Sequence, residues 1–203
     1  MDTDTGQIIF CRIPKTNPVE NPFSIGVISD SLNISKLDID FWRKLKKEFE
    51  DRGVTDIIHC GNIAADDIGR EELKNFTVYY KIRQKQIYFG KAPENWRLIP
   101  EEEPIVQING RQFYIHSALA RILLEESGAD MHRECLKTLE SYPEVSFILY
   151  GGTNDAFLQE GQRARIINPG DIVSSRSFAV ICLPKTEITF GYVPVDPLPL
   201  ITN

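Results

Sequence analysis

An alternation of short apolar runs with a helical pattern, in the first third of the chain, constrains the fold most. Residues 25–29 (Ile-Gly-Val-Ile-Ser) form a short, β-branched run, which is typical of a buried strand. A helical segment follows and ends near Gly53, a residue that favours helix C-termini. Its apolar positions recur every fourth residue and are Phe41, Leu45 and Phe49. A second apolar run covers residues 54–60. A strand, a helix and a strand in this order predict a parallel sheet.

The rest of the chain continues this mixed pattern. Residues 105–115 contain an Asn-Gly pair between two apolar runs, which strongly indicates a β-hairpin. Helices are predicted over residues 67–76, 119–126 and 130–141. Further strands are predicted over residues 77–82, 145–150, 163–167, 177–182 and 187–192, and we expect the last three to complete a second sheet. The sequence therefore predicts an α/β fold with two sheets.

The chain of 203 residues is long enough to form one substantial core. We divide it into an N-terminal extension (1–22), a folded domain (23–192) and a proline-rich C-terminal tail (193–203). The formal net charge of −6 argues against a general binder of nucleic acids or anionic membranes. No apolar run reaches the roughly 20 residues of a membrane span, and the acidic N-terminus lacks a signal-peptide core. We expect a cytoplasmic protein whose scattered cysteines are reduced thiols.

Five short blocks place polar residues at the ends of predicted strands. They are residues 28–32 (Ile-Ser-Asp-Ser-Leu), 58–62 (Ile-His-Cys-Gly-Asn), 78–80 (Val-Tyr-Tyr), 114–118 (Tyr-Ile-His-Ser-Ala) and 149–154 (Leu-Tyr-Gly-Gly-Thr-Asn). A sixth block, residues 167–171 (Ile-Asn-Pro-Gly-Asp), follows them. In order and spacing the blocks resemble those of the calcineurin-like metallophosphoesterases, specifically the small bacterial and archaeal phosphodiesterases. The resemblance implies a four-layer α/β/β/α sandwich built on two mixed sheets.

The resemblance also implies a site at which carboxylates, imidazoles and an asparagine hold two metal ions, so that a bridging hydroxide attacks phosphorus. The positions that match this cleft are Asp30, Asn62, Gln84, His116, Gly152 and Asn154. Several of them carry residues that the family pattern does not have. Asn62 replaces the aspartate that bridges both metals, and Leu32 replaces a histidine. Gly152 and Asn154 stand where the family has two further histidines.

Too few strong metal ligands remain for a two-metal centre. The first metal would keep Asp30, with weak help from Asn62 and Asn154, and the second would keep only His116, with Asn62 and Gln84. Divalent transition ions need several charged or imidazole ligands. We therefore predict no resident cofactor and no catalytic residue, and at most a weakly bound manganese or other divalent ion. The two other histidines, His59 and His132, are interpreted as structural or surface residues.

Two aromatic residues and a basic strip flank the third block. Tyr79 and Tyr80 could stack on a ligand, but such a pair more often places one ring inward and one at the rim. Lys81, Arg83 and Lys85 alternate and could bind a phosphate without metal. We favour a solvated strand face, because alternating charges commonly mark an exposed edge.

The terminal segments carry apolar residues without the periodicity of a core element. They are residues 8–10 (Ile-Ile-Phe) and the tail from Val193 to Ile201. Exposed apolar surface commonly marks a partner site, so we predict self-association or partner binding through these segments. The alternative, that the tail folds back over its own domain, stays open. The family's eukaryotic retromer subunit is a precedent for this fold as a protein-binding scaffold.

Three functional hypotheses follow from these observations. The first is a catalytically inactive metallophosphoesterase-like protein that serves as an interaction or assembly module. The second is a metal-dependent phosphodiesterase or phosphatase with weak or altered activity. The third is a metal-free nucleotide or phosphate binder that uses Lys81, Arg83 and residues 151–153. We favour the first, although a fold alone does not determine a function.

Overall fold

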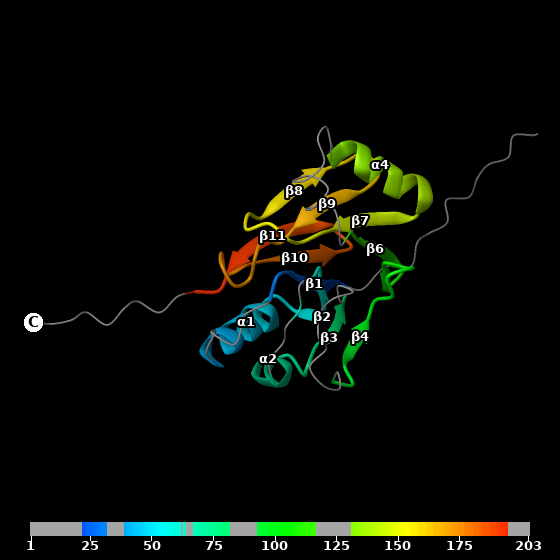
Figure 1. Cartoon of the computed structure of the whole chain (residues 1–203). Coiled ribbons are helices and arrows are strands. Elements are labelled where there is room, and N and C mark those ends of the chain that lie inside the picture. The colour runs from blue at the N-terminus through cyan, green and yellow to red at the C-terminus, as the bar shows by residue number, and fades with distance from the viewer. Residues whose placement is uncertain are drawn as a thin grey trace, which may run out of the picture.

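The protein folds into two β-sheets that pack face to face, with helices on the two outer sides (Figure 1). The structure is a computed structural model, and it describes residues 22–31, 39–61, 63, 67–81, 93–116 and 131–194. The predicted helix over residues 119–126 and the apolar residues 8–10 lie outside this part of the chain. So does the tail after residue 194.

The first sheet has six strands in the order β11-β10-β1-β2-β3-β4. Its strands are β1 (Phe23–Ile28), β2 (Val54–His59), β3 (Thr77–Tyr80), β4 (Trp96–Leu98), β10 (Ser177–Leu183) and β11 (Glu187–Tyr192). β1, β2 and β3 run parallel, as the alternation of strands and helices predicted. β4, for which no strand was predicted, pairs parallel with β3. β10 runs antiparallel to β1, and β11 antiparallel to β10.

The sheet membership of β10 and β11 differs from the prediction, which placed both in the second sheet. β10 instead pairs with β1, so that Ile25 faces Ile181 across the ladder. Its side chains are buried on both faces: Phe178 packs under the helices, and Ala179 packs against the other sheet. A strand covered on both faces is apolar at nearly every position. This pattern marks a central strand but does not indicate which sheet contains it.

The second sheet has five strands in the order β5-β6-β7-β9-β8. They are β5 (Ile105–Ile108), β6 (Arg111–Ile115), β7 (Val145–Leu149), β8 (Phe157–Glu160) and β9 (Arg165–Asn168). β5 and β6 form the predicted hairpin, with Asn109 (φ 46°) and Gly110 (φ 78°) in its turn. Positive φ at both positions is the geometry that an Asn-Gly hairpin turn requires.

The outer layers confirm the four-layer α/β/β/α sandwich. The described helices are α1 (Ile39–Asp51), α2 (Asp67–Glu72) and α4 (Met131–Ser141). α1 and α2 lie against the first sheet, and α4 lies on the opposite side, against the second (Figure 1). The Phe49 ring of α1 packs edge-on against the Phe178 ring, and the two ring centroids are 5.2 Å apart. It also lies where a Cβ on Gly26 would be 2.9 Å away, so a glycine at that position lets the helix approach the sheet.

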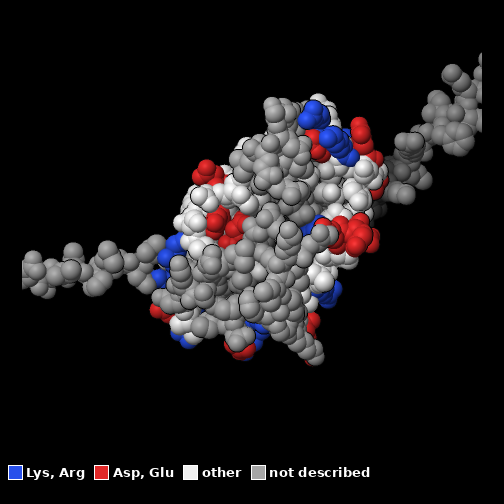
Figure 2. All heavy atoms as spheres, in the orientation of Figure 1, with Lys and Arg blue, Asp and Glu red and all other residues white. Residues whose placement is uncertain are grey.

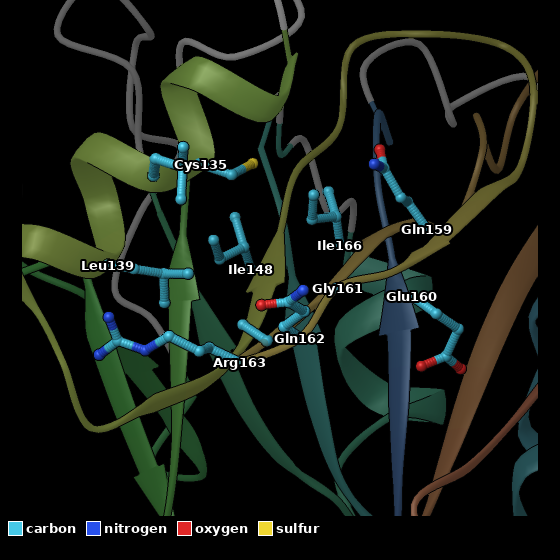
Figure 3. Close-up of a pocket in the computed structure, with 11 residues that line it drawn as sticks. Cys135, Leu139, Ile148, Gln159, Glu160, Gly161, Gln162, Arg163 and Ile166 are labelled. Carbon is cyan, nitrogen blue, oxygen red and sulfur yellow. The ribbon is translucent and has the colours of Figure 1, made fainter.

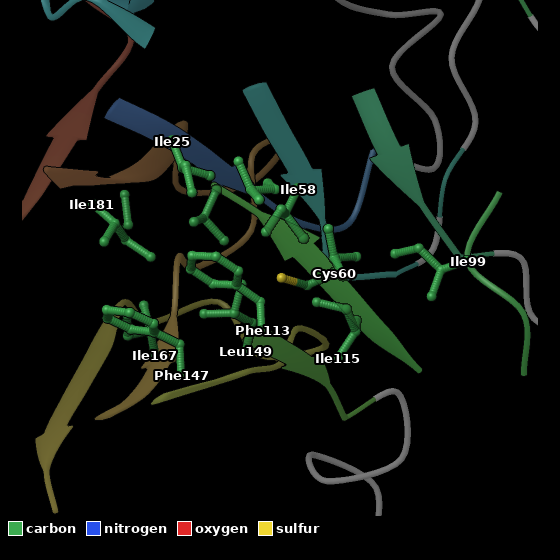
Figure 4. Packing of buried hydrophobic residues seen from close by; sticks show 14 of the residues in the cluster. Ile25, Ile58, Cys60, Ile99, Phe113, Ile115, Phe147, Leu149, Ile167 and Ile181 are labelled. Atoms are coloured by element: carbon green, nitrogen blue, oxygen red, sulfur yellow. The ribbon is translucent and has the colours of Figure 1, made fainter. Parts of the chain in front are cut away.

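Between the two sheets lies an apolar core to which both contribute (Figure 4). Phe113 of β6 stacks on Phe147 of β7, with ring centroids 5.0 Å apart. Facing them from the first sheet are Ile25, Ile58 and Ile181, which are fully buried. These contacts fix how the two sheets sit relative to each other, and therefore bring their strand ends together.

Val193 belongs to the folded domain rather than to an exposed apolar tail. It is 1% exposed, packs in the cluster beneath α1, and donates its N–H to the Arg176 carbonyl at 2.9 Å. The expected apolar surface of the tail therefore does not include this residue. The described cysteines, Cys60, Cys135 and Cys182, form no disulfide bond with one another. Within the described ranges, no helix is both long and apolar enough to span a bilayer.

Candidate functional site

The candidate site lies at the edge where parallel strands of both sheets end. Asp30 follows β1, Lys81 follows β3, His116 follows β6, and the loop of residues 150–154 follows β7. Backbone hydrogen bonds hold neighbouring loops together. Asp30 donates its N–H to the Gly61 carbonyl at 3.1 Å, and His116 donates to the Leu149 carbonyl at 2.8 Å. Open α/β sheets commonly place their ligand sites at such strand ends.

Asp30 is the carboxylate that the sequence placed at the centre of the site. It is 9% exposed, and its backbone has the left-handed φ of 56°. Its Oδ2 atom accepts a hydrogen bond from the Gly152 N–H at 2.6 Å and another from the Ser29 hydroxyl. A buried carboxylate needs such donors, because an unpaired buried charge is costly. The protein therefore stabilises Asp30 with its own polar hydrogens.

Gly151 makes this arrangement possible, because no side chain fits at its position. A Cβ there would lie 1.7 Å from the Ser29 Oγ and 3.2 Å from the Asp30 Oδ2. The loop after β7 therefore approaches the loop after β1 at backbone distance. Gly152, predicted as a cleft residue, contributes its backbone N–H and no side chain.

A buried asparagine supports the same loop from the other side. Asn168 is fully buried at the end of β9 and donates from Nδ2 to the Thr153 hydroxyl. Its Oδ1 accepts from the Gly170 N–H at 2.8 Å. The Asn154 carbonyl accepts from the Asp171 N–H at 3.4 Å, while the residue as a whole is exposed. The Asn-Pro-Gly block therefore holds the loop, and Asn154 takes part through its backbone.

His59 and Ser31 resemble a catalytic base and nucleophile, but their hydrogen bonds do not suit that role. The His59 Nε2 and the Ser31 Oγ are 2.9 Å apart, and both residues are buried. The Gly61 N–H donates to His59 Nδ1 at 3.3 Å, so Nδ1 is the acceptor and Nε2 carries the hydrogen. Burial also lowers the pKa of His59 to about 3. The ring therefore donates to Ser31 and cannot take its proton, which confirms the structural interpretation of His59.

His116 lies at the end of β6, as predicted, and is only partly buried. Its ring makes an edge-on contact with the Tyr114 ring, with centroids 5.7 Å apart. Burial lowers its pKa; the nearby Glu134 carboxylate opposes this effect, and the Lys81 ammonium adds to it. The lowered pKa favours a neutral imidazole at neutral pH.

Lys81 does not lie on a solvated strand face, as the alternating charges had suggested. It is 6% exposed and directly follows the buried Tyr80. Burial lowers the pKa of its ammonium, an effect that Glu101 and Glu102 oppose. No acceptor in the described part of the chain is in hydrogen-bond or ion-pair contact with it. The position of Lys81 immediately after a buried parallel strand is the sequence signal that could have indicated its burial. Arg83 and Lys85, the other members of the predicted basic strip, lie outside the described residues.

The adjacent tyrosines follow the prediction of one inward ring and one ring at the rim. Tyr80 is 4% exposed and packs on Trp96, with centroids 5.6 Å apart. Tyr79 is partly buried, and the Arg97 guanidinium lies 5.7 Å from the centre of its ring. Neither arrangement requires a bound ligand.

The described residues of this edge do not by themselves supply the ligand set of the two-metal centre that the resemblance implies. Across the described ranges, no three His, Cys, Asp or Glu side chains gather closely enough to hold a metal ion. Asp30 already accepts two hydrogen bonds on one oxygen. The buried Lys81 adds positive charge at the same edge of the sheet. Asn62 and Gln84, the remaining predicted cleft residues, lie outside the described residues.

On the face shown in Figure 2, acidic and basic side chains are interspersed over the described surface. No continuous basic field covers the described residues of that face. Since phosphate backbones are bound mainly by clustered Lys and Arg, the described part of this face does not have the charge pattern of a nucleic-acid interface.

Comparison with known proteins gives fold relatives only. A scan against protein-family models and a search of curated proteins find no match to the sequence. Among solved structures, an archaeal phosphodiesterase matches with a TM-score of 0.56 and 17% identity, over 83% of this chain and 99% of that one. A predicted phosphoesterase from Streptococcus pneumoniae matches with a TM-score of 0.55 and 14% identity, over 88% and 94%. Vacuolar protein sorting 29 of Cryptosporidium parvum matches with a TM-score of 0.57 and 13% identity, over 84% and 96%.

The two packed mixed sheets and these matches define the class: the chain has the calcineurin-like metallophosphoesterase fold. This confirms the fold class and the resemblance inferred from the six sequence blocks. At these identities the likeness concerns the fold, and the function has to be argued from the site.

Proposed function

We propose that this protein is a metallophosphoesterase-fold protein without two-metal hydrolysis, and that it serves as an interaction or assembly module. The observation that carries the proposal is the Asp30 carboxylate, which accepts hydrogen bonds from the Gly152 N–H and the Ser29 hydroxyl. Donor hydrogens therefore already occupy one of the two carboxylate oxygens, Oδ2, and compete with a cation for it. The same loop of residues 151–154 carries no imidazole.

The energetic argument concerns dehydration. Two divalent ions give up strongly held water only for several charged or imidazole ligands. Here the strong donors at matching positions are Asp30 and His116, and the nearby Lys81 ammonium opposes cation binding. Neutral amides such as Asn154 are weak replacements. The fold itself is compatible with several functions, because an archaeal phosphodiesterase and a vacuolar protein sorting protein both have it.

We further propose that self-association or partner binding uses the terminal segments, and that the protein works in a reducing compartment such as the cytoplasm. Support for the second point comes from Cys60, Cys135 and Cys182, which form no disulfide bond among the described residues. Removing residues 195–203 is expected to weaken association and leave the fold intact. Val193 should be retained, because it is buried in the domain core.

The decisive experiment combines metal analysis with a hydrolysis assay. Protein purified without chelator is loaded with manganese, and its metal content and its hydrolysis of bis(p-nitrophenyl) phosphate are measured. We expect no paired transition ions and no turnover above that of free manganese. Two metals at near-stoichiometric occupancy, located by anomalous scattering between Asp30 and His116, would contradict the proposal. That result would instead support the second hypothesis, a phosphoesterase with altered metal dependence.

Restoring the missing ligands tests the same proposal in the opposite direction. Leu32→His, Asn62→Asp, Gly152→His and Asn154→His together are expected to raise manganese affinity, because they restore ligands at matching positions. Each change alone should do little. Robust hydrolysis from Asn62→Asp alone would show that the protein is an enzyme one charge short of activity.

Lys81 favours a second candidate function, a metal-free phosphate binder. Lys81 is 6% exposed as a residue and has no ion-pair partner among the described residues, so its ammonium would gain from a bound anion. Titration with inorganic phosphate, followed by NMR, tests this function. Binding should be lost in Lys81→Met and kept in the matched control Lys185→Met, because Lys185 is exposed in a turn. Equal binding by both variants, or no binding by the unmodified protein, would reject this candidate.

A further inference from the structure

A pocket lies on the outer face of the second sheet, between α4 and the hairpin formed by β8 and β9 (Figure 3). Its volume is about 350 Å³. Leu139 of α4, Ile148 of β7 and Ile166 of β9 form an apolar floor. The polar Gln162 lies at the rim, in the turn between β8 and β9. A volume of this size, with an apolar floor and few polar groups, is typical of a binding site.

The pocket borders an edge of the second sheet. β8 is the last strand of that sheet and, among the described strands, pairs only with β9. Phe157 and Gln159 lie on the same face of β8 as the pocket, and Phe157 is 37% exposed. An unpaired edge of this kind presents backbone N–H and C=O groups to any extended segment that binds beside it.

Residues 195–201 (Val-Asp-Pro-Leu-Pro-Leu-Ile) have the sequence of an edge strand, because only one side of this segment can pair with a neighbouring strand. Two prolines, Pro197 and Pro199, alternate with two leucines, Leu198 and Leu200. In an extended strand, alternate residues share both a face and a hydrogen-bonding side. The Leu198 and Leu200 N–H groups would therefore face β8, with both side chains toward the pocket. The prolines, which lack an N–H, would face solvent, where an edge strand tolerates them.

Charge agrees with this assignment. Asp196 precedes the proline-leucine pairs, and Arg163 lines the pocket in the turn between β8 and β9. The one carboxylate that lines the pocket, on Glu160, pairs with the Arg165 guanidinium at 2.7 Å. The rim therefore carries one basic group that is not balanced by a neighbouring carboxylate in the described structure.

The reach of the chain favours a second copy over the same molecule. The Lys44 ammonium of α1 donates to the Pro194 carbonyl at 3.4 Å, which holds this residue on the first-sheet side. The pocket lies on the opposite side, next to α4 (Figure 1). From Pro194 to Leu198 an extended chain spans at most about 14 Å. This span is shorter than the distance across the layers from α1 to the outer face of the second sheet, because a helix is about 10 Å wide and the two sheets are about 10 Å apart.

We propose that residues 195–201 of a second copy bind along the free edge of β8, with Leu198 and Leu200 in the pocket. This assignment rests on the interaction role proposed above and names both the surface and the partner. If each copy exchanges its segment with the other, two equivalent contacts form, as in a symmetric dimer.

The first experiment measures binding of the segment in trans. A fluorescein-labelled peptide of residues 193–203 is titrated into full-length protein carrying Leu198→Asp and Leu200→Asp, and anisotropy is recorded. We expect saturable binding, at least tenfold weaker when Gln162→Trp and Arg163→Glu are added. Both rim residues are exposed, so these changes leave the core intact. Lys185→Glu, a charge reversal in a distant exposed turn, is the matched control and should not alter binding.

The second experiment measures self-association of the full-length protein by sedimentation velocity. We expect dimers that the leucine variant and the rim variant each weaken at least tenfold. A mixture of the two variants should form a heterodimer, because one supplies the segment and the other the pocket.

The alternative outcomes each overturn a stated part of the proposal. If Gln162→Trp and Arg163→Glu do not change the affinity for the peptide, the segment does not bind in this pocket. A monomeric full-length protein whose leucine variant still binds the peptide would mean that the segment binds its own molecule. Self-association without peptide binding would leave the interaction role standing and reject this surface. The manganese and hydrolysis measurements are independent of all these results.

Discussion

The buried His59 should make the stability of the protein depend on pH in a defined window. Its ring is 2% exposed, and burial lowers its pKa to about 3, compared with about 6.5 for an unfolded chain. The unfolded state therefore binds a proton more readily than the folded state between these values. The stability of the neutral ring is fully present above pH 6.5 and is lost as the pH falls toward 3.

The expected magnitude follows from the width of the window. Each pH unit within it costs about 1.4 kcal/mol, so lowering the pH from 6.5 to 5.0 removes about 2 kcal/mol. Typical domains unfold with only about 5 to 15 kcal/mol, so this loss is readily measured. Below pH 5 carboxylates titrate as well, and the upper part of the window therefore gives the cleaner comparison.

Urea denaturation of the protein and of His59→Gln at pH 7.0, 6.0 and 5.0 tests this reasoning. Glutamine can donate to Ser31 but does not titrate, so the difference between the two free energies of unfolding should fall by about 2 kcal/mol from pH 7.0 to 5.0. His116→Gln is the control, because His116 is only partly buried and should contribute less. Parallel pH profiles for the protein and His59→Gln would refute a neutral buried ring. So would an NMR titration of the His59 ring with a midpoint near pH 6.

Three further predictions concern stability and can be measured by urea denaturation at pH 7. Gly151→Ala should lower the free energy of unfolding by about 1 to 3 kcal/mol, because the added Cβ would lie 1.7 Å from the Ser29 Oγ; no loss would mean that the two loops separate easily. Lys81→Met should raise it by about 1 kcal/mol, because it removes a buried ammonium; a loss would indicate a compensating partner. Val193→Ala should lower it by about 1 to 2 kcal/mol, whereas removal of residues 195–203 should change it little.

Much of the fold was predictable because local patterns determine it. The apolar spacing of Phe41, Leu45 and Phe49 identified α1, and all three side chains are buried. Asn109 and Gly110 identified the hairpin, since few other residue pairs adopt positive φ at both positions. In these elements local propensity and tertiary packing favour the same structure.

The remaining elements depend on contacts that are distant in sequence. β10 is apolar at almost every position, and only its pairing with β1, over 150 residues away, assigns it to the first sheet. β4 and β8 were not predicted. They have three and four residues and lie at sheet edges, where half-exposed side chains give no clear alternation. Such short strands are defined by their neighbours rather than by their own sequence.

The site was predictable in position but not in its interactions. Motif spacing placed Asp30 and His116 at strand ends, where the structure also has them. It could not show that the Gly152 backbone N–H is aimed at Asp30, because every residue type except proline has a backbone N–H. Nor could it show the burial of Lys81, because alternating charges in a sequence carry no information about how deeply each side chain is buried.

The strand-end loops are held by bonds that need no metal, and this has a consequence for ligand repair. Asp30 is fixed on both sides, through its N–H to the Gly61 carbonyl and through its carboxylate to the Gly152 N–H. The Ile172 N–H also binds the Ser29 carbonyl at 3.1 Å. A metal bound after the four ligand substitutions would have to compete with the Gly152 N–H and the Ser29 hydroxyl for Oδ2, or use Oδ1 alone. The repaired site should therefore bind manganese more weakly than its number of ligands suggests. By the same reasoning, a chelator should leave the stability of the unmodified protein unchanged, because the hydrogen bonds of Ser29, Asp30, Gly61 and Gly152 run directly between protein groups.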